Sequence, residues 1–259
     1  MLTLAQIEQQ YPEHLRPFKR FILREYLQYK ILEIIFSSEY ATKLSFLGGT
    51  ALRIVHNNTR FSEDLDFDNF NLEDGEFEEL SEKVRSELTA QGFAVEIKLA
   101  GKEAFRCNVR FPDILYANDL SPHDSEKILV QIDSVAHGFQ YQPDKIILNK
   151  FDVFSEIFVT PLDILLSQKI CAAVTRKRTK GRDFFDIVFL LSMAKPNYQY
   201  LKLNFGVDNA NDLRAKFQNA IADLDFAELG RDVQGFLFNT SDVKKIELFK
   251  EFIAQAPLD

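Results

Sequence analysis

The pattern of apolar residues changes once along this chain of 259 residues, near residue 146. Before that point, stretches of alternating polar and apolar residues, which are typical of strands, lie between segments with helical spacing. Beyond it, apolar residues recur at helical spacing. This order predicts an α+β protein, with a mixed sheet and helices first and a mainly helical C-terminal half after them.

Individual elements follow from the same periodicity. In the first half we expect helices over residues 15–36, 51–56 and 77–91, and strands over 43–47, 64–67, 94–99, 105–111 and 127–133. In the second half we expect helices over 160–174, 182–193, 212–221, 226–236 and 243–255. Thr160, Pro161 and Asp163 give the first of these a cap, a proline at its first position and an acid in its first turn. We place a domain boundary near residue 150, between a core of residues 1–150 with an N-terminal helix and a helical domain of residues 151–259 that completes the active site.

Composition excludes several classes of protein. No stretch approaches 18 uninterrupted apolar residues, and the first ten residues have neither a basic leader nor an apolar run, so we expect no membrane partner and no secretory signal. The two cysteines, Cys107 and Cys171, are too few for a disulfide framework and lack metal-ligand spacing. The expected location is therefore the cytoplasm.

Charge is unevenly distributed in this acidic chain, which has a net charge of −8. Residues 61–79 contain nine acids and no base, whereas residues 169–182 contain six bases and no acid: Lys169, Arg176, Lys177, Arg178, Lys180 and Arg182. Either run is compatible with a solvated face. The second is also suited to binding a polyanion.

A phosphate site is indicated at Gly48, Gly49 and Thr50, which lie between a predicted strand and a predicted helix. Backbone N–H groups at such a turn bind phosphate, the glycines allow close approach, and the Thr50 hydroxyl adds a donor. Taken alone, the two glycines are weak evidence, because Gly-Gly also occurs in a simple tight turn.

Two carboxylates follow at a distance that suits this site. Thirteen residues separate Thr50 from Asp64, enough for a short helix and a turn, and Asp64 and Asp66 share one face of the next strand. Such a pair can hold Mg²⁺ beside a bound phosphate, although Asp-x-Asp by itself is also compatible with an exposed strand edge. Asp133, expected at the end of a neighbouring strand, is a third candidate ligand, with a strand-terminal turn as its alternative role.

A lysine interrupts the buried stripe of the helix expected over 160–174. On a helical wheel Lys169 falls between the apolar Leu165 and Leu166, which implies an anionic partner unless the ammonium extends to the surface. Asp183 and Asp186 share a face of the next, otherwise apolar, helix and need cations, for which Lys169 and Arg182 are candidates. The alternatives are a substrate phosphate beside Lys169 and a buried ion-pair cluster that joins the two helices.

Three stretches together resemble the AbiEii/AbiGii toxin family of nucleotidyltransferases, over roughly residues 15–255. They are Phe46-Leu-Gly-Gly-Thr-Ala-Leu52, Arg60-Phe-Ser-Glu-Asp-Leu-Asp-Phe67, and Lys169-Ile through Gly181-Arg-Asp-Phe-Phe-Asp186. The resemblance implies the minimal nucleotidyltransferase fold of the polymerase-beta superfamily. It also implies a cytoplasmic toxin of a toxin–antitoxin or phage-defence pair, with a cognate antitoxin as partner.

Site residues follow from this resemblance position by position. Gly48, Gly49 and Thr50 take the nucleotide-phosphate loop, with Ser62 and Lys169 as further nucleotide-binding positions, while Asp64 and Asp66 take the metal. Lys169 and Asp183 take the essential basic and acidic positions of the later motifs, and Asp133 is less well marked.

The implied reaction is Mg²⁺-dependent transfer of a nucleotide from an NTP to an acceptor, with the 3′ end of tRNA favoured. A protein or small-molecule acceptor is the first alternative. A catalytically silent module that binds nucleotide or antitoxin is the second, and the intact Asp64 and Asp66 argue against it.

Overall fold

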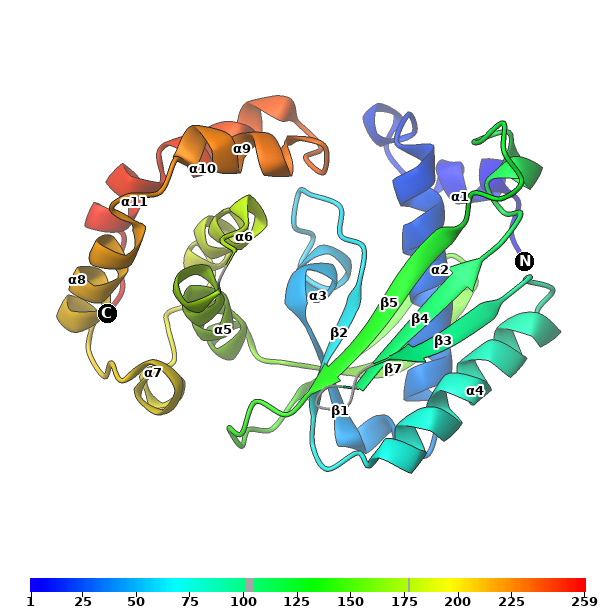
Figure 1. Cartoon of the computed structure of the whole chain (residues 1–259), viewed down its shortest axis with the longest axis horizontal. Helices are drawn as coiled ribbons and strands as arrows, with labels where there is room; N and C mark the ends of the chain where they lie inside the picture. The colour runs from blue at the N-terminus through cyan, green and yellow to red at the C-terminus, as the bar shows by residue number, and fades with distance from the viewer. Residues whose placement is uncertain (101–104, 177) are drawn as a thin grey trace. The chain divides into compact units, whose positions relative to one another are not determined.

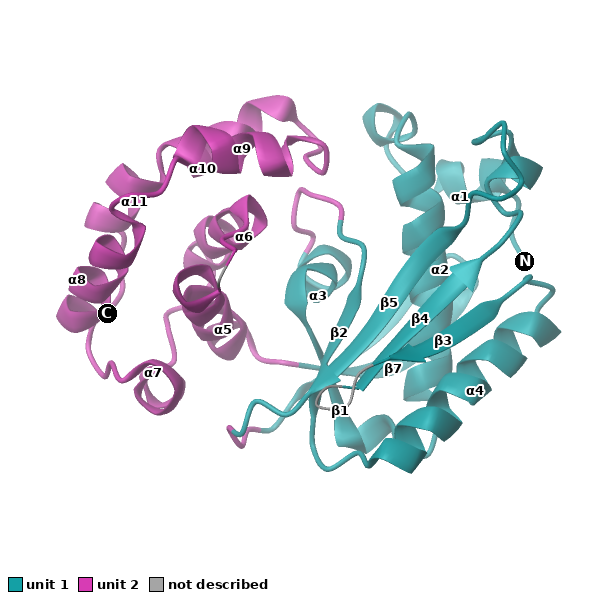
Figure 2. Cartoon of the chain, in the orientation of Figure 1, with its two compact units in different colours: residues 1–56, 62–138, 142–159 teal, residues 57–61, 139–141, 160–259 magenta. Residues whose placement is uncertain are grey.

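The computed structural model describes residues 1–100, 105–176 and 178–259 (Figure 1). The chain divides into unit 1, which comprises residues 1–56, 62–138 and 142–159, and unit 2, which comprises residues 57–61, 139–141 and 160–259 (Figure 2). Unit 1 contains the predicted mixed sheet and unit 2 is helical, which confirms the α+β class. Among the residues covered, no helix combines the length and the apolar character needed to span a bilayer.

Unit 1 is built on a seven-stranded sheet with the order β3-β4-β5-β2-β1-β7-β6. The strands are β1 (Leu44–Leu47), β2 (Leu65–Asn69), β3 (Glu96–Ala100), β4 (Phe105–Phe111), β5 (Ile128–Val135), β6 (Asp144–Lys150) and β7 (Val153–Val159). Strand β2 is parallel to β5 and β1 is parallel to β7, whereas the other neighbours are antiparallel. The sheet is therefore mixed, and its central strands β1 and β2 are short.

The helices in the described part of unit 1 are α1 (Leu4–Gln9), α2 (Lys19–Phe36), α3 (Gly48–Ile54) and α4 (Asp74–Ala90). Short 3₁₀ turns occur at η1 (Glu13–Leu15), η2 (Ala41–Lys43) and η3 (Tyr116–Asn118). Helix α2 packs on β5 and β7, α4 packs on β3 and β4, and the two helices contact each other. They cover the apolar face of the sheet.

Helix α2 differs from the amphipathic helix expected over residues 15–36. It begins only at Lys19, after η1 and Pro17, because proline is tolerated at the start of a helix but not inside it. Thirteen of its 18 residues are buried, since α1, α4 and the sheet all pack against it. It is a central helix and has no broad solvated face.

A hairpin that the sequence pattern did not indicate extends the sheet beyond the expected boundary. Strands β6 and β7 pair over Asp144–Lys150 and Val153–Val159, and β7 also pairs with β1 at Phe46. The expected boundary near residue 150 thus falls inside a hairpin that is part of the sheet. The last crossing between the units follows Val159 instead.

Unit 2 contains helices α5 (Leu162–Thr175), α6 (Gly181–Leu191), α7 (Tyr198–Phe205), α8 (Ala210–Ile221), α9 (Phe226–Gln234), α10 (Lys244–Glu247) and α11 (Phe249–Gln255), with a 3₁₀ turn η4 (Thr240–Val243). Its core is aromatic: the ring of Phe184 lies 5.0 Å from that of Phe226 and 4.8 Å from that of Phe249. These contacts join α6 to α9 and α11. Aromatic pairs at this spacing stabilise a protein beyond the free energy gained by burying their area.

Three local predictions in unit 2 need correction. Helix α5 has Pro161 as its cap residue, and the Thr160 hydroxyl pairs with the Tyr141 hydroxyl at 2.8 Å instead of capping the helix. The helix expected over 243–255 is broken at Leu248 into α10 and α11. Helix α7 was not expected, although Asn197 caps it through Tyr200 and Gly206 ends it in the left-handed conformation.

Residues 57–61 belong to unit 2 although they lie between two segments of unit 1. The Phe61 N–H donates to the carbonyl of Phe236 at 2.8 Å, and the Phe238 N–H donates to the carbonyl of Thr59 at 3.1 Å. Arg60 thereby forms an isolated antiparallel bridge with Leu237. The chain that leads into β2 is therefore held as a strand-like segment of unit 2.

Candidate active site

The predicted meeting of the glycine turn and the acidic strand is present in unit 1. Strands β1 and β2 are antiparallel with Leu47 opposite Asp66, and α3 begins at Gly48 directly after β1. Gly48 has φ of +79°, and a Cβ atom built there would lie 2.2 Å from Oδ2 of Asp66. Only glycine satisfies both the backbone conformation and the close approach of this carboxylate.

Asp64 and Asp66 lie on one face of their segment, as the alternation predicts. Leu65 and Phe67 between and after them are fully buried, at 0% and 1% exposure, while both aspartates are partly exposed. Strand β2 starts at Leu65, so Asp64 immediately precedes it. The two carboxylates therefore project away from the core beside the Gly48 turn.

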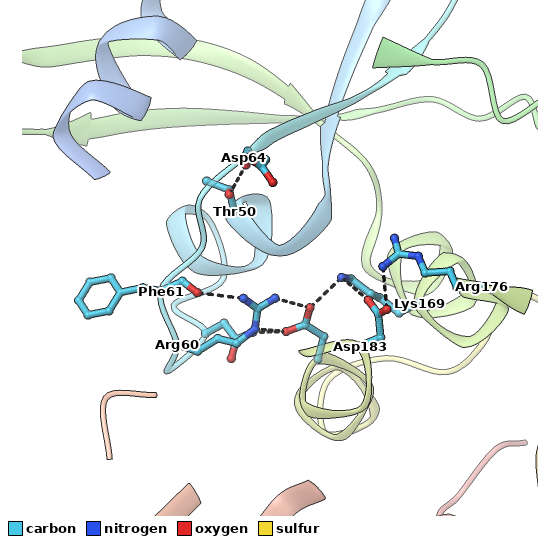
Figure 3. A network of polar contacts seen from close by, with 9 residues as sticks. Thr50, Arg60, Phe61, Asp64, Lys169, Arg176 and Asp183 are labelled. Atoms are coloured by element: carbon cyan, nitrogen blue, oxygen red, sulfur yellow. Dashed lines mark hydrogen bonds and ion pairs between the residues drawn. The ribbon is translucent and has the colours of Figure 1, made fainter. Parts of the chain in front are cut away.

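Hydrogen bonds to the carbonyls of Asp64 and Ser62 hold the backbone of this segment. The buried Thr50 hydroxyl donates to the carbonyl of Asp64, as Figure 3 shows, so it fixes the backbone that carries the first aspartate. The sequence predicted a phosphate donor at this hydroxyl, which in the structure is engaged with the Asp64 carbonyl. The Ser62 carbonyl accepts from the Gln28 side-chain amide at 3.1 Å, which ties the same segment to α2.

Asp133 lies beside Asp66 in the sheet. The two residues are register partners in the parallel pair β2–β5, and β5 continues to Val135, so Asp133 is inside its strand and not at the strand end as expected. Its carboxylate accepts from Arg106 at 2.7 and 3.1 Å and from the Gln131 amide at 2.8 Å. The Arg106 guanidinium thus neutralises the third carboxylate.

Mg²⁺ is compatible with this set of side chains. Carboxylate oxygens are its preferred ligands, and the Gly48 turn leaves Asp66 the space that any larger side chain would fill. Within the described ranges, however, no three acids, histidines or cysteines are grouped closely enough to hold a metal ion. Asp64 and Asp66 fit the role of ligands, and Asp133 would have to release Arg106 to join them.

Electrostatics link Arg106 to all three acids. Its hydrogen bonds and ion pair with Asp133 raise the pKa of Arg106, and the charges of Asp64 and Asp66 raise it further. Since like-charged carboxylates repel one another, an arginine at this place stabilises the cluster when no metal is bound.

In unit 2, Lys169 is paired with the two carboxylates that follow it in sequence. Its Nζ lies 3.1 Å from Asp183 and 2.8 Å from Asp186, and its side chain is 14% exposed. Figure 3 shows the pairing of Lys169 with Asp183. Attraction to Asp186 and Asp183 outweighs burial and raises the pKa of Lys169. The anion that the buried stripe implied is therefore a pair of protein carboxylates.

Asp186 is the most enclosed member of this cluster. Arg60 donates to both of its oxygens, at 2.8 and 2.6 Å, and the Asn58 amide donates at 2.9 Å. Burial alone would raise the pKa of Asp186, but Arg60 and Lys169 lower it to about 2. Asp186 thus holds residues 58–60 to α6 within unit 2.

The basic loop between α5 and α6 is partly used by the same cluster. Arg176, with a side chain 46% exposed, pairs with Asp183 at 2.8 Å, and the Arg182 guanidinium lies 4.9 Å from the Phe236 ring centroid. Arg178 and Lys180 are exposed, while Lys177 lies outside the described residues. Arg176 therefore belongs to the ion-pair cluster, whereas Arg178 and Lys180 form the solvent side of the loop.

Two arginines of these clusters, Arg60 and Arg106, had no predicted role. Arg60 directly precedes the acid-rich stretch and belongs to a motif quoted above, but its partner Asp186 is 126 residues away. Arg106 lies in a strand whose polar positions alternate, which could have marked an open face. Neither pairing could be deduced without the three-dimensional fold.

Comparison with solved structures gives the same architecture. JHP933 from Helicobacter pylori is 18% identical, over 90% of this chain and 91% of that protein, with a TM-score of 0.54. A second H. pylori structure, described as a candidate nucleotidyltransferase, is also 18% identical, over 90% of this chain and 93% of that one, with a TM-score of 0.54. At this identity the likeness establishes a common fold. No curated protein matches the chain in sequence.

A family model supplies what the fold alone does not. The model described as the nucleotidyl transferase AbiEii toxin of type IV toxin–antitoxin systems matches residues 30–250, a range that includes both clusters. The chain therefore belongs to the AbiEii family of nucleotidyl transferase toxins of type IV toxin–antitoxin systems.

Proposed function

We propose that this nucleotidyltransferase toxin uses Mg²⁺ to transfer a nucleoside monophosphate from an NTP to the 3′ end of an RNA, with tRNA as the favoured acceptor. In the proposed reaction the acceptor hydroxyl attacks the α-phosphate in line and pyrophosphate leaves. The observation that carries the proposal is the close approach of Asp66 to Gly48, which sets one carboxylate of the pair against the first residue of α3.

Each residue of unit 1 has a proposed task. Asp64 and Asp66 would hold the metal, and the Gly48-Gly49 backbone would bind the β- and γ-phosphates. Thr50 acts by fixing the backbone of Asp64, since its hydroxyl donates to that carbonyl. When bound, the metal neutralises charge on the phosphates.

Lys169 and Asp183 are proposed to act through the cluster in unit 2. The Lys169 charge is already balanced by two carboxylates, so a positioning role between α5 and α6 is favoured over direct neutralisation of triphosphate. The exposed Arg178 and Lys180 are proposed to attract the acceptor, since the protein as a whole is acidic.

The test is to incubate the protein with Mg²⁺ and each NTP labelled at the α-phosphate, together with total cellular RNA or total protein. We expect label at RNA 3′ ends, mainly in tRNA. Label in the protein fraction would move the acceptor to a protein side chain, and the absence of label with every NTP would favour a silent binding module.

Asp66→Asn tests the metal assignment in this assay, and Asp124→Asn is its control. Losing one of two repelling carboxylates should leave the fold intact and abolish transfer, whereas Asp124→Asn, at an exposed acid of the same unit, should change neither. Folding is checked by the melting temperature. Full transfer by folded Asp66→Asn protein would refute the metal assignment.

A further inference from the structure

We propose that the open face of β3, β4 and β5 binds the sugar–phosphate backbone of the RNA acceptor, through Lys98 and Arg110 and without regard to base sequence. This inference rests on the proposed function, because it names the surface of unit 1 that the acceptor strand would cover. It concerns residues to which no catalytic task has been given.

The open face is defined by the alternation of the strands. On β4, Cys107, Val109 and Phe111 are fully buried beneath the helices. The residues between them, Arg106, Asn108 and Arg110, therefore project from the opposite face. All three are partly or fully exposed.

Strand β5 continues this surface. Its residues Ile128, Val130 and Ile132 are buried, so Leu129, Gln131 and Asp133 project to the open side. Leu129 is 37% exposed, which shows that the surface is not covered there by the rest of the chain.

Strand register connects the open face to the proposed metal ligands. Asp66 is opposite Asp133, and Asp133 is opposite Arg106. Arg110 lies four residues further along β4, about 13 Å from the row of Asp133. A strand of RNA whose 3′ end reaches the carboxylates could therefore continue over the same face.

Lys98 completes the basic positions of this surface. It is opposite Asn108, which is in turn opposite Gln131, so a lysine and two amides form the next row of the face. Gln131 already donates to Asp133 at 2.8 Å and Asn108 to the Lys98 carbonyl at 3.4 Å, but each amide has a second N–H that suits phosphate and ribose oxygens.

Charge on the face favours a polyanion. The two acids are paired, Asp133 with Arg106 and Glu96 with Lys127 at 2.8 Å. Lys98 and Arg110 form no ion pair among the residues that the structure covers. They leave an uncompensated positive charge on this part of an otherwise acidic protein, and phosphates are the chemistry that such charge recognises.

The composition of the face also indicates how the RNA is recognised. None of the described residues that project from it on β3, β4 and β5 is aromatic, so bases have no ring on which to stack. Proteins that select single-stranded bases generally use aromatic stacking. Contacts with the backbone alone imply equal affinity for different sequences.

The experiment compares two double variants of the full chain. Lys98→Gln with Arg110→Gln removes the two charges from the open face. Lys83→Gln with Arg85→Gln removes two charges from α4, on the other side of the sheet. Binding of fluorescein-labelled oligo(U) and oligo(A) RNA is followed by fluorescence anisotropy over a range of KCl concentrations, and melting temperatures verify folding.

We expect the open-face variant to reduce the slope of log K against log [KCl] by about 1.4, since each contact with single-stranded RNA contributes about 0.7. Affinity should then be about 25-fold weaker at 0.1 M KCl, equally for both RNAs. The α4 variant should match the wild type. An unchanged slope, an equal loss in the α4 variant, a preference for one RNA, or no RNA binding by the wild type would each overturn the inference.

The assay measures binding without transfer, so it separates two kinds of failure. If the wild type labels RNA but the open-face variant binds RNA normally, the surface is wrong and the proposed reaction stands. If the wild type labels only protein, the proposed acceptor is wrong, and the anisotropy still decides whether this face binds RNA.

Discussion

Gly48 combines a left-handed backbone conformation with a close contact to Asp66, a proposed metal ligand. Its positive φ would strain any other residue, and its missing side chain is what lets the Asp66 carboxylate lie against the turn. Gly92 has a similar φ of +92°, but a Cβ there would meet nothing within 4 Å. Comparing variants of Gly48 and Gly92 therefore distinguishes the cost of backbone strain from the effect of the contact with Asp66.

We expect Gly92→Ala to cost about 1–2 kcal/mol of stability, because it places alanine in the left-handed region, and Gly48→Ala to cost more, because its Cβ also clashes with Asp66. Only Gly48→Ala should also displace Asp66, weaken Mn²⁺ binding and abolish nucleotide transfer. Urea unfolding measures the first effect, and Mn²⁺ titration followed by electron paramagnetic resonance measures the second. Equal Mn²⁺ affinity in the two variants would contradict the role given to Gly48.

At this scale the sequence predicted what depends on local spacing. Gly48, Asp64 and Asp66 were identified because a short helix and a turn fill the interval between them, and the structure places Gly48 against Asp66. Arg60 was missed because its partner lies in another helix, at a position that only tertiary packing determines.

Among the elements, α5 and α6 are joined by charges in an apolar setting. Lys169 of α5 lies between Asp183 and Asp186 of α6, which in turn hold Arg176 and Arg60. A buried pair contributes little compared with apolar packing, but removal of one partner leaves an uncompensated charge.

We expect Lys169→Met to destabilise the protein by roughly 1–3 kcal/mol, because it removes the cation shared by Asp183 and Asp186, which keep Arg176 and Arg60 as partners. The melting temperature without nucleotide should fall by on the order of 5 °C. A variant as stable as the wild type that no longer transfers nucleotide would instead assign Lys169 to the triphosphate.

Acid should loosen the same pair of helices. The pKa of Asp186 is lowered to about 2 from an ordinary value of 3.8, so its stabilising contribution is complete above about pH 4 and is lost as the pH falls towards 2. The loss should be on the order of 2 kcal/mol between about pH 5 and about pH 2.

Urea unfolding across this range tests the expectation. Asp186→Asn will be less stable than the wild type across this pH range. Between about pH 5 and about pH 2, its free energy of unfolding should fall by about 2 kcal/mol less than that of the wild type. Parallel curves for the two proteins would show that Asp186 does not titrate as described.

Strands with strict alternation of polar and apolar residues could be predicted, whereas an exposed strand at the sheet edge could not. Strand β4 was predicted with its observed bounds because it alternates strictly, whereas the β6–β7 hairpin was missed. Strand β6 is at the edge of the sheet and mostly exposed, so few of its residues show the alternation that burial imposes.

For the whole molecule, a net charge of −8 opposes contact with nucleic acid, so any RNA binding must come from local clusters of lysine and arginine. The solvent side of the α5–α6 loop is one such place. Because Arg176 is engaged with Asp183, the informative positions are Arg178 and Lys180.

We expect Arg178→Gln with Lys180→Gln to reduce the salt dependence of RNA binding by up to about 1.4 units without changing stability. Lys195→Gln with Lys202→Gln, which removes two exposed charges elsewhere in unit 2, serves as the control. If both variants bind like the wild type at every salt concentration, the loop is only a solvated face.

The passage of residues 57–61 through unit 2 has a consequence for how the toxin is made. During synthesis Arg60 leaves the ribosome well before Asp186, so the segment ahead of β2 has no carboxylate to receive it until α6 has been translated. A chain that ends before α6 would keep the contacts of Thr50 and Gln28 with this segment but would lack the partner of Arg60. The segment that leads into β2 is therefore held on both sides only after α6 has been translated.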